Sequence, residues 1–139
     1  MKIMVSACLL GQKCKYNGGD NYSEKAAIFL EGHEVISVCP EVEGGLSIPR
    51  YPCEIVNGVV TNDHGESKDH EFRIGAERCL QRALDEKVEL VILQSRSPSC
   101  GVKQIYDGSF TGTLMKGQGV FAELLVRNGI RVMDVEDLD

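Results

Sequence analysis

Short apolar runs that end in a turn carrying a cysteine recur along this chain, and they constrain its fold more than any other feature. The clearest case is Val91–Gly101, where an apolar run passes into serines and a proline before reaching Cys100. Such a polar, proline-containing turn cannot continue a central strand. The same arrangement occurs at Lys2–Cys8 and at Val35–Cys39. The pattern predicts three buried strands, each of which releases one thiol at its carboxyl end.

Helix-like segments separate these strands. Ser23 is a typical N-cap residue in front of a short apolar face, and residues 69–86 and 117–128 carry apolar side chains at the spacing of amphipathic helices. Ile130–Met133 supplies a fourth strand. Alternating strands and helices predict an α/β fold, with a mostly parallel sheet between helices on both faces. We expect a single three-layer domain over residues 1–139.

Three thiols are therefore expected at one edge of the sheet. Sites in such folds form in the crevice outside the carboxyl ends of the strands, which is where Cys8, Cys39 and Cys100 would meet. A cubane iron–sulfur cluster normally uses four thiolates, so three would leave one iron free to bind a soft substrate atom such as sulfur. Zinc bound by three thiolates and a fourth group, a catalytic thiol, and cysteines that only pack in the core are the alternatives.

Two further segments carry turn signals. Residues 39–52 contain paired glycines and three prolines, and we expect a shaped loop in which Gly44 and Gly45 let the backbone approach a ligand. Residues 54–60 predict a hairpin around an Asn-Gly pair. Residues 104–113 predict a hairpin or ordered loop that turns at an Asp-Gly pair.

Charge and composition limit the partners. The chain has 139 residues, six cysteines and a net charge of −6, which argues against a nucleic-acid polymer or an anionic membrane as the main partner. No apolar run approaches the ~18 residues of a membrane span, and no signal-peptide pattern precedes the first strand. We expect a cytoplasmic protein with free thiols and a solvated acidic tail at residues 134–139. The oligomeric state stays open.

Longer motifs extend the pattern over nearly the whole chain. They are S-A-C-L-L-G (6–11), Y-N-G-G (16–19), V-C-P-E-V-E-G-G-L (38–46), P-R-Y-P-C-E-I (49–55), R-S-P-S-C-G (96–101) and I-Y-D-G-S-F-T-G-T (105–113). Together they resemble the DUF523 family. The characterised members that this sequence resembles are thiouracil and thiouridine desulfidases. These enzymes hold a [4Fe-4S] cluster by three cysteines and use its open iron to take sulfur from a thiolated pyrimidine.

The resemblance implies a role for five residues of this chain. Cys8, Cys39 and Cys100 would bind a [4Fe-4S] cluster in which one iron is not ligated by protein. Glu41 would be the acid/base carboxylate and Ser97 the assisting hydroxyl. The implied activity is a desulfidase that acts on a small thiouracil-like or thiouridine-like heterocycle, with a pyrimidine or nucleoside as substrate and hydrosulfide as product.

The residues themselves support a catalytic carboxylate but leave alternatives. Glu41 lies two positions after Cys39, and a shielded carboxylate can take a proton from water and return one to departing sulfur. It could instead cap a turn or only pair with Arg50, and Glu43 is a rival. Ser97 could orient the substrate or relay a proton, although serine before proline is also an ordinary turn former.

The remaining cysteines and aromatic residues define the other hypotheses. Cys79 falls on an apolar helix face and is expected in the core. Cys14 or Cys53 could supply a fourth thiolate, which would close the open iron and make the protein a non-catalytic redox or iron sensor. A zinc-binding structural domain is a third hypothesis. Ser99, like Ser97, could act on the substrate or only form a turn. Four aromatic residues could stack on a heterocycle or pack under loops: Tyr16, Tyr51, Tyr106 and Phe110.

Overall fold

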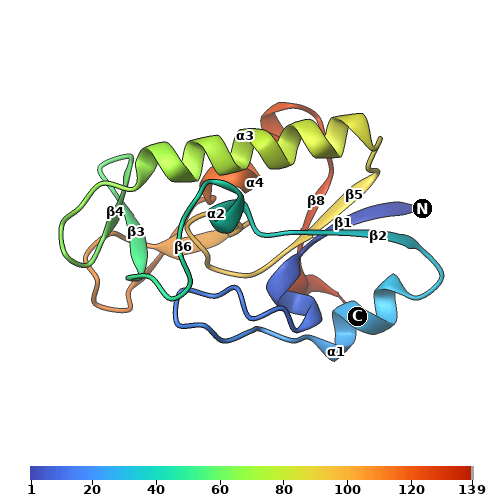
Figure 1. The fold of residues 1–139 in the computed structure, drawn as a ribbon, viewed down its shortest axis with the longest axis horizontal. Coiled ribbons are helices and arrows are strands. Elements are labelled where there is room, and N and C mark those ends of the chain that lie inside the picture. Colours follow the sequence, from blue (N-terminus) through green and yellow to red (C-terminus); the bar gives the residue numbers. More distant parts are fainter. Residues whose placement is uncertain (139) are drawn as a thin grey trace.

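A four-stranded parallel sheet forms the centre of the computed structural model, which describes residues 1–138 (Figure 1). Its strands are β1 (Lys2–Ser6), β2 (Glu34–Val38), β5 (Leu90–Leu93) and β8 (Val132–Asp134), in the spatial order β2-β1-β5-β8. Every neighbouring pair is parallel. The four predicted strands and the α/β fold are confirmed, although β8 begins later than expected.

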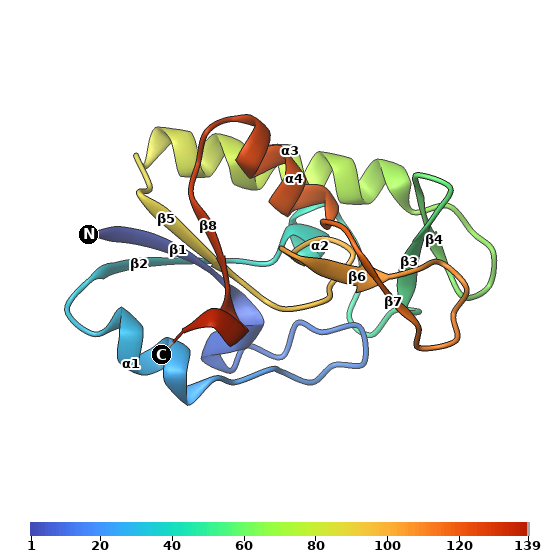
Figure 2. The same ribbon diagram turned by 180° about the vertical axis from the view of Figure 1, so that it is seen from behind.

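Helices cover both faces of this sheet. Helices α3 (Asp69–Asp85) and α4 (Val120–Arg127) lie on one face, whereas α1 (Glu24–Leu30), η1 (Ala7–Leu10) and η2 (Val135–Asp137) lie on the other (Figure 2). Alternate strand residues therefore enter two separate cores. Met4 packs with the α3 side and Ile3 with the α1 side, as the two-residue period of a strand requires.

The predicted start of the first helix is confirmed, and a short helix appears that was not predicted. Ser23 Oγ accepts a hydrogen bond from the Ala26 N–H at 3.1 Å, which makes it the N-cap of α1. Helix α2 (Pro40–Glu43) follows Cys39 directly, with proline at the position where its fixed φ favours helix entry.

Helices α2 and α3 cross at two glycines. A Cβ atom on Gly75 would lie 1.8 Å from the Pro40 carbonyl oxygen, and one on Gly44 would lie 1.9 Å from the Glu71 carbonyl oxygen. Only glycine permits this approach. The expectation that Gly44 brings the backbone to a ligand is therefore wrong, because this residue packs α2 against α3.

Two hairpins extend beyond the carboxyl ends of the central strands. Strands β3 (Cys53–Val56) and β4 (Val59–Asn62) are joined at Asn57 and Gly58, whose φ values of 49° and 81° suit the predicted tight turn. Strands β6 (Gln104–Tyr106) and β7 (Leu114–Lys116) form the second hairpin, which ends later than predicted. Both lie at the end of the molecule away from the N-terminus (Figures 1 and 2).

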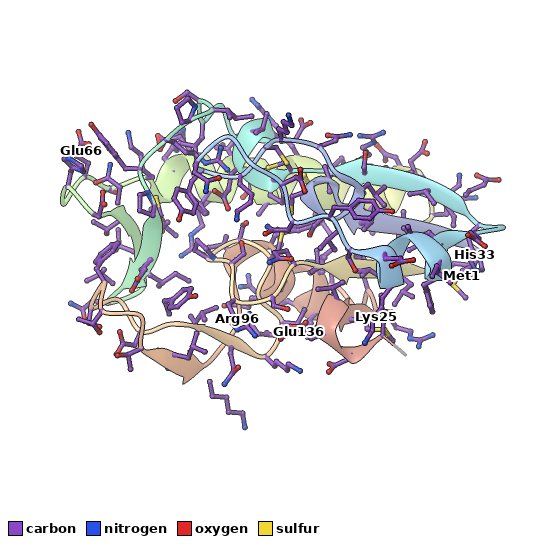
Figure 3. All side chains as sticks on the ribbon, turned by 90° about the horizontal axis from the view of Figure 1, so that it is seen from below. Met1, Lys25, His33, Glu66, Arg96 and Glu136 are labelled. Atoms are coloured by element: carbon purple, nitrogen blue, oxygen red, sulfur yellow. The ribbon has the colours of Figure 1, made fainter. Side chains whose placement is uncertain are left out.

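The end of the chain packs against the turn after β5, so the expectation of a fully solvated tail is wrong. Asp134 is buried and accepts hydrogen bonds from Ser95 Oγ at 2.6 Å and from the Glu136 N–H at 2.8 Å. Figure 3 shows Arg96 beside Glu136, and Arg96 Nη2 lies 2.6 Å from Glu136 Oε2. Within residues 1–138, no helix combines the length and apolarity needed to cross a bilayer.

Candidate active site

A cavity of about 670 Å³ opens beyond the carboxyl ends of β1, β2 and β5. The chain leaves β1 toward β2 on one side and later returns to place β5 on the other side of β1. This reversal of strand order creates the crevice in which α/β folds bind ligands. The cavity therefore lies where the strand pattern predicts a site.

The structure places all three predicted thiols in the wall of this cavity. Cys8 lies in η1 directly after β1, Cys39 is the N-cap of α2 after β2, and Cys100 lies in the turn after β5. Cys14 and Cys53 also line the cavity. Cys79, as expected, is buried in the core beside the sheet and is not part of this wall.

The environments of the three thiols differ. Contact with the Cys14 thiol lowers the pKa of Cys8, against the effect of burial, and Asn21 Nδ2 donates to Cys8 Sγ at 3.5 Å. Contact with Cys14 also lowers the pKa of Cys39 to about 7 despite burial, with help from the Val42 backbone. The same two contacts raise the pKa of Cys14. Burial raises the pKa of Cys100.

This donor set fits an iron–sulfur cluster. Metal ligands must be thiolates, and the local contacts favour the thiolate at Cys8 and Cys39, whereas at Cys100 the charge of a bound metal would have to do so. Across residues 1–138, no three His, Cys, Asp or Glu side chains converge around a single point closely enough to hold one metal ion. The three thiols instead line one cavity that is large enough for a multinuclear group. Hydrogen-bond donors near the sulfur atoms, such as Asn21 Nδ2 at Cys8, are typical of cluster sites.

The backbone fixes the turn that carries Cys100. The first N–H groups of α4 donate to its carbonyl oxygens: Gly119 to Gly101 at 2.8 Å, Val120 to Pro98 at 2.9 Å and Phe121 to Ser99 at 2.9 Å. These N–H groups have no partner inside the helix, so the turn satisfies them. A Cβ atom on Gly119 would lie 2.5 Å from the Ser99 carbonyl carbon, which explains the glycine there.

Glu41 lies on α2 and lines the cavity beside Cys39. Its Oε1 accepts hydrogen bonds from Arg50 Nε at 3.1 Å and Arg50 Nη2 at 3.0 Å, so the alternative pairing with Arg50 does occur. Its Oε2 accepts a hydrogen bond from Ser99 Oγ at 2.8 Å. The rival carboxylate, Glu43, is exposed and lies outside the cavity lining.

Ser97 also lines the cavity, but it contacts Ser99 and not Glu41. The two serine hydroxyls lie 2.9 Å apart, and Ser97 Oγ accepts hydrogen bonds from the Ser99 and Cys100 N–H groups at 3.1 and 3.0 Å. The sequence alone does not decide whether Ser99 belongs to the site or only forms a turn, and it does not indicate the contact of Asn21 with Cys8. Proximity to Cys100 was a signal for Ser99, whereas nothing in the sequence relates Asn21 to Cys8.

The cavity has two walls of different origin. The inner wall consists of Cys8, Cys39–Glu41 and Ser97–Cys100, all from turns that follow central strands. The outer wall consists of Glu54, Tyr106, Phe110 and Gly112, from the two hairpins.

Two of the four candidate aromatic residues thus lie on the outer wall, and Tyr16 lines the cavity from the loop after η1. Tyr51 instead stacks on His64, with ring centroids 3.7 Å apart.

Comparison with known proteins shows the family to which this chain belongs. A sequence model of the family described as 2-thiouracil desulfurase matches residues 3–137. The uncharacterized protein YbbK of Bacillus subtilis (strain 168) is 37% identical over 147 residues, covering 99% of this chain and 97% of the relative. The solved structure of the [4Fe-4S]-dependent thiouracil desulfidase TudS, also designated DUF523Vcz, matches with a TM-score of 0.91 and 41% identity, covering 99% of this chain and 92% of that one. The resemblance to DUF523 is confirmed, and the chain belongs to the 2-thiouracil desulfurase family.

Proposed function

We propose that this protein is a [4Fe-4S]-dependent desulfidase that removes sulfur from a small thiolated pyrimidine and releases hydrosulfide. One observation carries the proposal: Cys8, Cys39 and Cys100 line a single cavity together with the carboxylate of Glu41. Membership of the 2-thiouracil desulfurase family and the likeness to TudS support the reaction class.

Cys8, Cys39 and Cys100 would hold the cluster through three of its irons and leave the fourth without a protein ligand. When bound, the cluster supplies a Lewis-acidic iron with a preference for soft sulfur. The protein supplies the thiolates, the enclosing cavity and the groups that handle protons. The inner wall is suited to this task because backbone contacts fix its turns.

Glu41 would act as the acid/base group. Water adds to the thiocarbonyl carbon and gives one proton to Glu41, which passes it to sulfur as the carbon–sulfur bond breaks. The hydroxyl left on carbon gives the second proton of the former water to the regenerated Glu41 carboxylate, and from there to solvent, as the carbonyl forms. The thiocarbonyl becomes a carbonyl and sulfur leaves as hydrosulfide, so the step needs no oxidant or reductant. Ser97 would orient the substrate or pass a proton through Ser99, whose hydroxyl lies between Ser97 and Glu41.

The outer wall would bind the pyrimidine ring. Tyr106 and Phe110 line the cavity, and their aromatic rings would stack on a flat heterocycle. The cavity volume lies within the range of about 300–1,000 Å³ typical of small-molecule sites. A shallower groove shares Asn21, Gln94 and Arg96 with the cavity and gives a nucleoside room for its sugar. The cytoplasmic location stays a prediction.

One contact favours the alternative of a fully ligated cluster in a redox or iron sensor. The Cys14 thiol contacts both Cys8 and Cys39, and it could supply a fourth thiolate. Cys53 lines the cavity without such contacts, and burial raises its pKa to about 12. Turnover separates the two hypotheses, because a sensor would carry the cluster without releasing sulfide.

The test is anaerobic reconstitution with iron and sulfide, followed by incubation with 2-thiouracil, 4-thiouracil and the corresponding thiouridines. Mass spectrometry measures the oxo product and a colorimetric assay measures sulfide. We expect equal amounts of both, from loaded protein only. A loaded protein that converts none of these compounds contradicts the desulfidase and favours the sensor.

A further inference from the structure

The carboxylate of Glu41 is held from two sides, and its contacts leave one acceptor position open. Oε1 accepts both N–H groups that Arg50 directs at it, and Oε2 accepts the hydroxyl of Ser99. An ionised carboxylate offers about four lone-pair positions. The fourth position belongs to Oε2, on a residue that lines the cavity.

Arg50 is itself fixed by groups other than Glu41. Its Nη2 donates to the Cys14 carbonyl oxygen at 2.9 Å, and its Nη1 donates to the Ser47 carbonyl oxygen at 3.1 Å. Its backbone N–H donates to the Tyr16 carbonyl oxygen at 2.7 Å. The Arg50 side chain is only 8% exposed. Four of the five guanidinium N–H groups are thus directed at protein oxygens, which holds the side chain in one orientation beside the Glu41 carboxylate.

Ser99 is fixed on the opposite side. It is 2% exposed, and its carbonyl oxygen accepts hydrogen bonds from the first turn of α4. A carboxylate can only accept, so the Ser99 hydroxyl gives its proton to Glu41 and must accept from Ser97. The hydrogen bonds therefore run in one direction, from Ser97 through Ser99 to Glu41.

We propose that Arg50 and Ser99 are positioning residues that hold Glu41 so that its one free acceptor position faces the reacting water. This inference rests on the proposed function, in which Glu41 is the acid/base group. Displacement of a reacting group by about 1 Å can cost about 100-fold in rate. The pairing of Glu41 with Arg50 is then part of the catalytic arrangement and not an alternative to it.

The test compares Arg50→Lys, Arg50→Ala and Ser99→Ala with the wild-type protein, after reconstitution to equal iron content and cluster absorbance. Lysine keeps the charge but lacks the planar fork, so we expect kcat to fall about 100-fold with KM changed less than about threefold. Added guanidinium should restore part of the activity of Arg50→Ala, and Ser99→Thr should keep most of it. Arg78→Lys is the matched control, because Arg78 donates a hydrogen bond to the Glu43 carbonyl oxygen at the end of α2 and is outside the cavity lining.

A rise in KM with unchanged kcat would assign substrate binding to Arg50 and overturn the proposal. Anaerobic crystal structures of Arg50→Ala and wild type give a readout that does not depend on turnover. We expect the Glu41 carboxylate to rotate away from its wild-type position in the variant. If it stays in place, the positioning role is wrong, whatever substrate the protein converts; if wild type converts no thiolated pyrimidine, the proposed function alone fails.

Discussion

The two walls of the cavity are built by different means. Backbone contacts fix the inner wall: the turn of Cys100 receives the first N–H groups of α4, and α2 crosses α3 at Gly44 and Gly75. The outer wall is also held by carboxylate side chains, Glu54 to the β6–β7 loop and Asp69 to strand β4, beside backbone contacts such as the Lys68 N–H to the Val60 carbonyl oxygen. Under the proposed function, the inner wall would carry the reacting groups and the outer wall would contact the substrate ring, so changes to the two walls should affect kcat and KM differently.

The largest expected effect comes from removing a thiol of the inner wall. Cys100→Ser should fail to retain the cluster and should lose turnover, because serine oxygen is a poor ligand for a soft site. Iron and acid-labile sulfide content after anaerobic reconstitution measure this directly. Cys14→Ser should keep both, since its thiol contacts two proposed ligands without being one of them.

Cys79→Ser is the matched control for a buried thiol, because Cys79 packs in the core. It should lower stability and leave the iron content unchanged. Loss of all iron from Cys14→Ser would instead make Cys14 a ligand and favour the sensor.

The second effect concerns the proton-handling group of the same wall. Glu41→Gln keeps the size and an acceptor oxygen of the side chain, yet it cannot take up a proton. We expect kcat to fall by about 10²–10⁴-fold with the cluster spectrum intact. Single-turnover sulfide release provides the measurement. Glu43→Gln on the same helix should behave as wild type; the reverse result would transfer the role to Glu43.

A smaller effect is expected from the outer wall. Glu54 Oε1 accepts hydrogen bonds from the Gly108 N–H at 2.9 Å and the Phe110 N–H at 3.1 Å. Glu54→Ala should release this loop and raise KM about tenfold, since hydrogen bonds to a charged group contribute about 1.5–3 kcal/mol. The kcat should change little, because the reacting groups belong to the inner wall. Steady-state kinetics measure both constants, with Glu54→Gln as the control because glutamine keeps an acceptor oxygen. A fall in kcat with unchanged KM would show that the comparison of the two walls is wrong.

The smallest effect concerns stability and its pH dependence. Burial alone would raise the pKa of Asp69, but hydrogen bonds from the Val60 N–H and Arg73 outweigh it and hold the pKa below its ordinary value. The stabilisation is therefore complete above the ordinary pKa and is lost as pH falls through the lowered folded value. Asp69→Asn should cost about 1 kcal/mol at pH 7.

Urea unfolding of the iron-free protein measures that difference. It should shrink toward zero at the most acidic pH at which the fold persists. A difference that is the same at every pH would show that the charge of Asp69 contributes nothing.

Local patterns were enough to predict the sheet and the common location of the thiols. Apolar runs that stop at proline or serine reveal strand ends, and parallel strands bring Cys8, Cys39 and Cys100 to one edge whatever lies between them. Helix α2 was missed because its proline and the glycines after it were interpreted as turn formers. Its packing depends on Gly75, which is distant in sequence.

Contacts between distant side chains were beyond such patterns. Ser99 and Glu41 lie 58 positions apart, and Ser95 and Asp134 lie 39 apart. Polar composition suggested a solvated tail, but a partner that only the fold supplies made burial of Asp134 possible. Arg50 is the exception: it is a possible partner of Glu41 from the sequence alone, it lies nine positions away, and the structure forms the pair.

The hydrogen bond from the Gly119 N–H to the Gly101 carbonyl oxygen, at 2.8 Å, determines how the β6–β7 hairpin is attached to the rest of the protein. It brings together the two ends of the segment 101–119, so the β6–β7 hairpin is an insertion whose two ends lie side by side at the edge of the central fold. Evolution can lengthen, shorten or resurface such an insertion at little entropic cost. Related proteins can thus differ in the β6–β7 hairpin, which would contact the substrate, while the position of the Cys100 sulfur atom stays the same.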